Sequence, residues 1–252
     1  MGLFSLKWTI MVVIFATSVG AGFTTLHIAN KYKKLISLGE ALASGIFIGA
    51  AIFHLLPDAT AGFLSTQHTS PLVDAFLVAA ASFLILMCIE QFMVKRIGSF
   101  RHIAHIGPLI ATLSIHAFIT GIALGISTTY TVVISLLVAI MAHKAFELFA
   151  LVINLHRQIK HNHYVRLLFL LFSCITPLGI FVGFSGGHYF SAATDDLLTT
   201  YFNAICAGTF IYIATIHSHH RHHPRSDGYQ KYEEVLASIA GVAVMGILAI
   251  WI

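Results

Sequence analysis

Apolar runs long enough to cross a lipid bilayer recur along the whole length of this 252-residue chain. A transmembrane helix needs roughly 20 consecutive, mostly apolar residues, and eight stretches of the sequence meet that requirement. The candidate spans are about 8–29, 36–57, 72–94, 108–128, 131–155, 166–189, 199–217 and 234–252. The sequence therefore predicts an all-α membrane protein with eight transmembrane helices, which form one integral-membrane domain over residues 1–252.

The composition agrees with a chain that is solvated by lipid. Only 10% of the residues are charged and 58% are hydrophobic, whereas a soluble domain carries about a quarter charged residues. The net charge of +4 is spread over short loops and forms no basic surface for nucleic acid. The lipid bilayer is therefore an expected partner and nucleic acid is not.

The basic residues follow alternate spans. Three of them follow each of the first, third, fifth and seventh candidate spans: Lys31, Lys33, Lys34; Lys95, Arg96, Arg101; Arg157, Lys160, Arg166; Arg221, Arg225, Lys231. The loops 58–71, 127–131 and 189–198 contain no lysine or arginine. Because cytoplasmic loops carry the excess of positive charge, both termini are expected on the non-cytoplasmic side. Lys7 is expected to precede the first span. The compact chain favours a plasma (inner) membrane.

Two adjacent spans carry ionisable residues at helical spacing. His116 and Thr120 lie four residues apart, as do His143 and Glu147, so each pair lies on one helix face. Such residues are costly in a bilayer and normally face the bundle interior. If these faces meet, two imidazoles, a carboxylate and a hydroxyl converge, which suits a borderline cation such as Zn²⁺. The simpler interpretation is a set of hydrogen-bonded histidines that hold helices together.

Other polar residues suggest a path on either side of that set. His54 and Asp58 have the same i, i+4 spacing at the outer end of the second span, and they are either an interfacial pair or an entrance relay for a cation. After the seventh span, histidines at His217, His219, His220, His222 and His223 form a tract without fixed spacing. Because His-rich tracts can bind metal, it is either an exit relay or a solvated cytoplasmic linker.

Small residues and proline mark positions for helix packing and bending. Gly121 and Gly125 lie four residues apart, a spacing that lets a neighbouring membrane helix approach closely. Pro177 and Gly179 interrupt the sixth span, where the freed backbone groups need a partner. These four residues are candidates for helix packing and hinge positions.

The chain resembles the ZIP (Zrt/Irt-like) family of divalent-metal transporters. The strongest motifs are His116-x-x-x-x-Gly121-x-x-x-Gly125 and His143-Lys-x-x-Glu147. Supporting motifs are Gly45-Ile-Phe-Ile-Gly49, His54-Leu-Leu-Pro-Asp58, Pro177-Leu-Gly179 and Gly208-Thr-Phe-Ile-Tyr212. The resemblance implies an eight-helix bundle with inverted repeats, spans 1–3 and 6–8, around spans 4 and 5. It also implies a metal site near mid-membrane between spans 4 and 5, and uptake toward the cytoplasm.

The family's metal positions fall on His116, Thr120, His143 and Glu147, with departures. Many members have a carboxylate where Thr120 stands and a polar residue where Ala117 stands. Lys144 takes the place of a further ligand in members that hold two adjacent metals. Its ammonium would repel a second cation, so Ala117 and Lys144 are read as second-site and charge-modulating positions.

The sequence thus predicts a transporter, most simply one for zinc, with no enzymatic activity and no organic cofactor. Zn²⁺ is the expected substrate, with Fe²⁺, Mn²⁺ and Cd²⁺ as alternatives, and a homodimer is left open. A second class is an intramembrane zinc-dependent hydrolase, but the sequence has no His-Glu-x-x-His motif, and the central set has no spare carboxylate to act as a base once Glu147 binds the metal. A third class is a haem protein with two axial histidines, which would show a Soret absorption band.

Overall fold

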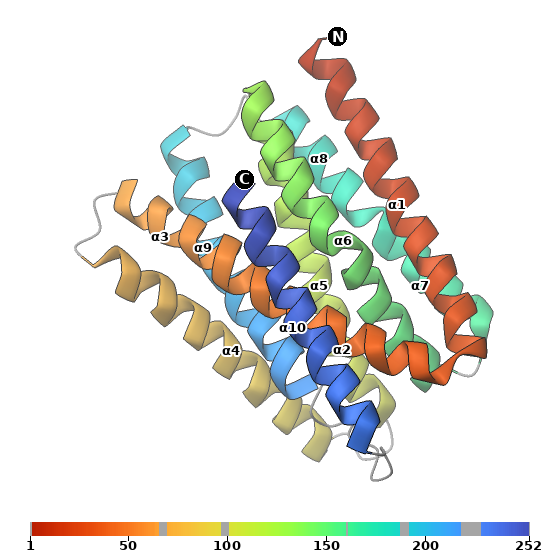
Figure 1. The fold of residues 1–252 in the computed structure, drawn as a ribbon. Coiled ribbons are helices and arrows are strands. Elements are labelled where there is room, and N and C mark those ends of the chain that lie inside the picture. Colours follow the sequence, from red (N-terminus) through yellow and green to blue (C-terminus); the bar gives the residue numbers. More distant parts are fainter. Residues whose placement is uncertain are drawn as a thin grey trace. The chain divides into compact units, whose positions relative to one another are not determined.

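The computed structural model of the protein describes residues 2–65, 70–96, 101–159, 161–186, 192–217 and 228–251. Within these residues, all the regular secondary structure is helical (Figure 1). The helices are α1 (Leu3–Lys31), α2 (Lys33–Ala50), α3 (Leu56–Ser65), α4 (Pro71–Arg96), α5 (Arg101–Ile126), α6 (Tyr130–Gln158), α7 (Asn162–Ser173), α8 (Ile175–Gly186), α9 (Ala192–Tyr212) and α10 (Gly228–Trp251). Two π-helical turns, η1 (Ala51–Leu55) and η3 (Ile213–His217), continue α2 and α9.

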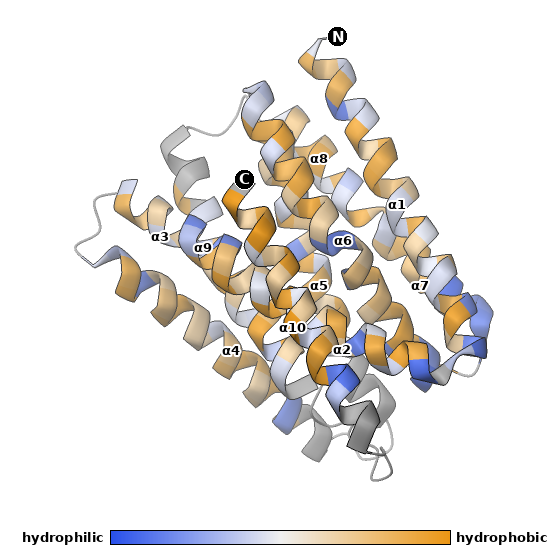
Figure 2. Ribbon diagram, viewed as in Figure 1, coloured by the Kyte–Doolittle hydropathy of each residue, from blue (hydrophilic) through white to orange (hydrophobic). Residues whose placement is uncertain are grey.

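Seven helical stretches among the described residues are long and apolar enough to cross a membrane: Leu3–Lys31, Lys34–Ser65, Pro71–Phe92, Leu109–Ile126, Tyr130–Gln158, Asn162–Gly186 and Tyr232–Ile250. The expected span 199–217 is helical as α9 and η3 but is not among these seven. Hydrophobic residues dominate the helices, and hydrophilic ones collect at the C-terminal end of α1 and the N-terminal end of α7 (Figure 2). The prediction of a multi-pass, all-α membrane protein is confirmed; the inverted repeat stays a prediction.

The helices form two compact units, each assembled from segments that are distant in the sequence. The first unit contains residues 1–31 and 110–195, and the second contains residues 32–109 and 196–251. All the residues of the predicted central metal set belong to the first unit. The second unit contains the predicted entrance pair, His54 and Asp58.

In the first unit, α1 runs antiparallel to the α7–α8 pair. The Phe4 and Phe184 rings lie 5.3 Å apart at one end, and the Phe23 and Phe169 rings lie 5.2 Å apart toward the other. The basic end of α1 therefore lies at the same end of the unit as the start of α7. This arrangement agrees with the expectation that both of these loops face the same side of the membrane.

Glycines bring α5 and α8 into backbone contact in this unit. A Cβ atom at Gly179 would lie 3.1 Å from the Gly121 Cα atom, and one at Gly183 would lie 3.0 Å from the Ile122 Cα atom. The nearest atoms to Gly125 likewise belong to the α8 backbone. Because membrane helices gain their packing energy from close approach rather than from expelling water, these small residues fix where α8 lies along α5.

In the second unit, glycines likewise allow α2 and α10 to pack closely. A Cβ atom at Gly241 would lie 2.8 Å from the Ile46 amide nitrogen, and one at Gly49 would lie 2.6 Å from the Met245 Cβ atom. Near the start of both helices, Lys34 Nζ lies 2.8 Å from Glu233 Oε2. The glycines explain how two apolar helices pack tightly here without large interlocking side chains.

The expected outer loop 58–71 is wrong in part, because helix continues through α3 as far as Ser65. Residues 59–65 carry an apolar face at i, i+4 spacing. Ala59 and Phe63 are fully buried, and they pack against Ala75 of α4 and Ala204 of α9. That tertiary contact stabilises two further helical turns that composition alone assigned to a loop.

Lys7 does not precede the first span, since α1 begins at Leu3. Its side chain is only 5% exposed, and Nζ donates a hydrogen bond of 2.5 Å to the Gly125 carbonyl oxygen. The Phe184 ring centroid lies 5.4 Å from the same nitrogen. The last carbonyls of a helix have no partner within it and favour a nearby cation, so Lys7 caps the C-terminal end of α5.

Candidate metal centre

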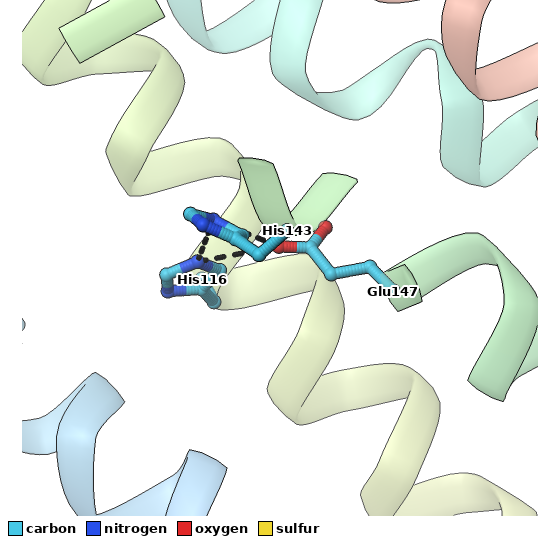
Figure 3. A group of neighbouring side chains, drawn as sticks. All are labelled: His116, His143 and Glu147. Carbon is cyan, nitrogen blue, oxygen red and sulfur yellow. Dashed lines mark hydrogen bonds and ion pairs between the residues drawn. The ribbon is translucent and has the colours of Figure 1, made fainter. Parts of the chain in front are cut away.

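Three potential metal ligands converge inside the first unit. His116 comes from α5, and His143 and Glu147 come from α6 (Figure 3). Their side chains are almost completely buried, at 1%, 2% and 1% exposure respectively. Within the described residues, they form a group whose ligand atoms all lie within 4.8 Å of one another.

The three ligand atoms form a nearly equilateral triangle. His116 Nε2 lies 3.5 Å from His143 Nε2, and each of these nitrogens lies 3.4 Å from Glu147 Oε1. In a tetrahedron, the edge is about 1.63 times the distance from centre to corner, so these edges correspond to metal–ligand bonds of about 2.1 Å, the length expected for zinc bound by imidazole and carboxylate. The triangle therefore has the size of one face of a zinc-ligand tetrahedron.

Helical spacing in the sequence produces the α6 part of this triangle. His143 and Glu147 are one turn apart and belong to a long buried face of α6 that also includes Leu151. The turn at 127–129 is short enough to return the chain from α5 directly into α6. Two neighbouring helices then present His116 and His143 to each other, as the sequence predicts.

Lys144 lies beside the triangle and binds the other oxygen of Glu147. Its Nζ lies 2.8 Å from Glu147 Oε2 and donates a hydrogen bond of 2.9 Å to Thr176 Oγ1. The Phe172 ring centroid lies 4.9 Å from Nζ, within the range of a cation–π interaction. A protonated Lys144 thus balances the single negative charge of the carboxylate in the absence of metal.

The break between α7 and α8 brings Thr176 and Phe172 to this ammonium. α7 ends at Ser173, Cys174 forms the turn, and α8 resumes at Ile175. Pro177 lies in the first turn of α8, where its missing N–H group is tolerated, although it would disrupt an uninterrupted helix. The resulting bend places an aromatic ring from α7 and a hydroxyl from α8 against the same lysine.

The remaining residues of the predicted set lie nearby in different roles. The Thr120 hydroxyl donates to the carbonyl oxygens of His116 and Ala117 in its own helix, at 3.0 and 3.2 Å. Ala117 is fully buried and has no polar side-chain atom. The hydroxyl hydrogen of Thr120 is therefore donated to the backbone of its own helix, and among the contacts of the described residues its oxygen accepts no hydrogen bond.

The two residues of the predicted entrance pair lie in contact, and their role as a relay stays a prediction. His54 Nδ1 lies 3.3 Å from Asp58 Oδ2, with side-chain exposures of 18% and 46%. His54 belongs to the π-helical turn η1, and such turns occur frequently at functional sites. The pair is thus accessible, in contrast to the buried triangle.

The predicted exit tract lies mostly outside the described residues. His217 is the last residue of η3, and nothing of its side chain is described. His219, His220, His222 and His223 lie outside the described part of the chain.

Sequence reasoning missed Thr176 and Phe172 as partners of Lys144. The usable signal was the lysine itself, since a cation in the middle of a span requires partners from other helices. Which helices supply them depends on the packing of α6 against α7 and α8.

Comparisons with known proteins identify the family. A model of the ZIP zinc transporter family matches residues 4–108 and 103–249. Zinc transporter 1 of Oryza sativa subsp. japonica is 23% identical over 99% of this chain and 84% of its own length. Zinc transporter ZIP2 of Mus musculus is 21% identical over 99% of each chain, and zinc transporter ZIP1 of Takifugu rubripes is 24% identical over 86% of each. The resemblance drawn from the motifs is confirmed, and the chain belongs to the ZIP zinc transporter family, whose members are transporters of divalent metal rather than enzymes.

Proposed function

We propose that this chain carries zinc across the membrane toward the cytoplasm, and that His116, His143 and Glu147 hold the ion during transport. The observation that carries this proposal is the buried triangle of two imidazole nitrogens and one carboxylate oxygen, with edges of 3.4–3.5 Å. Relatives that align along most of the chain are named zinc transporters, which supports zinc as the substrate.

The position of the triangle along its helices supports a site near mid-membrane. Lys144 is the central residue of the 29-residue helix α6 (Tyr130–Gln158), and His143 and Glu147 flank it. His116 lies near the centre of the apolar stretch Leu109–Ile126. An ion held there lies near mid-membrane, where alternating-access carriers place their substrate sites.

The proposed site holds one ion. Its three ligands supply one formal negative charge, and Lys144 opposes the approach of a second cation. Thr120 or water would complete the coordination shell. A site with little net negative charge binds its ion less tightly than a carboxylate-rich one, which helps release, because a transported ion must leave as well as enter.

The ligand chemistry favours zinc over the alternatives Fe²⁺, Mn²⁺ and Cd²⁺. Imidazole suits zinc, whereas carboxylates, carbonyls and water suit manganese. With Thr120 in place of a carboxylate, nitrogen supplies two of the three buried ligands.

Accessory residues extend the proposal to both membrane faces. His54 and Asp58 would gather ions on the non-cytoplasmic side, where both termini also lie, and His217 with the histidines that follow would receive them in the cytoplasm. The alternating distribution of Lys and Arg along the loops supports this orientation. A plasma membrane is the proposed location.

Uptake by proteoliposomes tests the proposal. Purified protein is reconstituted with an internal metal-sensing dye, and Zn²⁺, Fe²⁺, Mn²⁺ and Cd²⁺ are offered in turn. We expect zinc influx that is largely lost in His143→Ala, because one of the three ligands is removed. His27→Ala, at an exposed position on α1, is the matched control and should transport like the parent. Normal zinc uptake by His143→Ala would show that the proposed site is wrong.

Zinc binding should weaken as the pH falls. An imidazole must lose its proton before its nitrogen can bind a metal, so His116 and His143 compete for protons and zinc. As the pH falls, we expect zinc affinity to fall by up to about tenfold per pH unit for each displaced proton. Calorimetric titration of the purified protein at several pH values measures this. A flat profile would contradict histidine ligation, and His27→Ala should keep the parent's slope.

A further inference from the structure

The two oxygens of Glu147 face different partners. Oε1 lies 3.4 Å from the Nε2 atoms of both His116 and His143. Oε2 lies 2.8 Å from the ammonium nitrogen of Lys144. A carboxylate can give a metal either one oxygen or two. Here the second oxygen is already engaged by a cation that belongs to the protein.

The Lys144 ammonium is itself held from two further directions. Thr176 Oγ1 accepts a hydrogen bond of 2.9 Å from Nζ, and the Phe172 ring lies 4.9 Å away. Lys144, Phe172 and Thr176 are at most 2% exposed. A lysine side chain is long and flexible, with its charge at one point, so its position depends on such contacts. Without the hydroxyl, the ammonium loses its one hydrogen-bonding partner from α8.

We propose that Thr176 and Phe172 are positioning residues that hold the Lys144 ammonium on Glu147 Oε2, and that this makes the site select zinc over larger, oxygen-preferring divalent ions such as Mn²⁺. This inference rests on the proposed zinc site. It explains the selectivity of the site by residues that do not touch the ion.

The physical argument concerns how many oxygens the site can offer. Zinc is satisfied by four ligands, nitrogen among them, and the triangle with one further ligand provides these. Mn²⁺ favours oxygen ligands in octahedral geometry, so a site limited to one carboxylate oxygen serves it poorly. If the ammonium leaves Oε2, Glu147 gains a second oxygen and a full negative charge for the ion. Both changes favour manganese more than zinc.

The contact between Thr176 and Lys144 depends on the close packing of α5 and α8. The Thr176 carbonyl is the nearest atom to the position that a Cβ atom at Gly121 would occupy. The α5 glycine therefore allows the first turn of α8 to approach so closely that the Thr176 hydroxyl reaches Lys144.

The test compares zinc and manganese uptake by the full-length protein in proteoliposomes. Thr176→Val removes the hydroxyl with little change of shape, and Thr176→Ser retains it. Ser173→Ala is the matched control: its buried hydroxyl bonds only the Phe169 carbonyl, at 2.8 Å, among the contacts of the described residues. Lys144→Met removes the ammonium itself. For each variant, kcat and KM are measured for Zn²⁺ and Mn²⁺, and Tm in detergent reports folding.

We expect Thr176→Val and Lys144→Met to raise the ratio of manganese to zinc kcat/KM by about tenfold. A change of this size corresponds to the loss of one hydrogen bond to a charged group. Thr176→Ser should restore the parent's ratio, and Ser173→Ala should leave it unchanged. An unchanged ratio in folded Thr176→Val overturns the positioning role of Thr176, and an unchanged ratio in Lys144→Met overturns the role of the ammonium, even if zinc uptake still depends on His143. If Thr176→Val does not fold, Lys144→Met decides alone. Failure of the parent to move zinc would instead overturn the proposed function.

Discussion

Glu147→Gln is expected to abolish zinc uptake and also to destabilise the protein. The substitution removes the only negative charge among the three converging ligands. Even outer-shell partners of metal ligands contribute about 10–100-fold to affinity or activity, so loss of a direct ligand should lower zinc flux by more than about 100-fold. The Lys144 ammonium also loses a partner at 2.8 Å, and breaking a buried ion pair from one side costs about 3–5 kcal/mol.

The double variant Glu147→Gln/Lys144→Met separates these two effects. It leaves no unpaired buried charge, so Tm in detergent should return toward that of the parent. Zinc flux should stay absent, because the ligand oxygen carries no charge. Proteoliposome uptake and Tm measured on the parent, the single variant and the double variant check this. Restored uptake in the double variant would show that Glu147 supports the fold without binding the ion.

Gly179→Leu is expected to destabilise the protein by forcing the backbones of α5 and α8 apart. A Cβ atom at this position would lie 3.1 Å from the Ile122 amide nitrogen and against the Phe118 carbonyl. Both neighbours are backbone atoms of α5, so relief requires α8 to move away. Overpacking costs about 1–3 kcal/mol, and occasionally more; a leucine carries three further carbons. The displacement would also draw Thr176 away from Lys144, so the ratio of manganese to zinc uptake should rise.

Gly20→Ala is the matched control for this effect. Gly20 also lies within a membrane-spanning helix, α1, but a Cβ atom there meets nothing within 4 Å. Alanine is the better helix former by about 1 kcal/mol, so Tm should stay the same or rise slightly. The Tm of both variants is measured by thermal unfolding in detergent, with the fraction of monodisperse protein as the readout. Equal Tm values for Gly179→Leu and the parent would contradict the close packing of α5 and α8.

The sequence predicted the class of the protein and the centre of the candidate site. Hydropathy gave the membrane helices because a bilayer accepts few other structures. The spacing of His143 and Glu147 gave one face of α6, since positions four apart in a helix always lie on the same side. The spacing of His116 and Thr120 in the adjacent span predicted His116 as the third member of the group. These predictions depend on local geometry, which the order of residues determines directly.

Predictions that depended on contacts between distant segments were less successful. Residues 59–65 looked like a loop, but Ala59 and Phe63 are buried against α4 and α9 and stay helical. Lys7 looked like a charge outside the membrane, but it caps the last turn of α5 through the Gly125 carbonyl. In both cases the partner lies far away in the sequence.

The amino-acid sequence by itself determined that this chain crosses a membrane as helices and carries two histidines and a carboxylate that can meet. Only the tertiary structure decided that those three atoms form a zinc-sized triangle, and that the other carboxylate oxygen is held by Lys144. The reason is that helical periodicity fixes directions within one helix, whereas distances of 3 Å between helices depend on how closely their backbones approach. Gly121 and Gly179 set that approach for α5 and α8, and it brings Thr176 to the lysine beside the proposed ion.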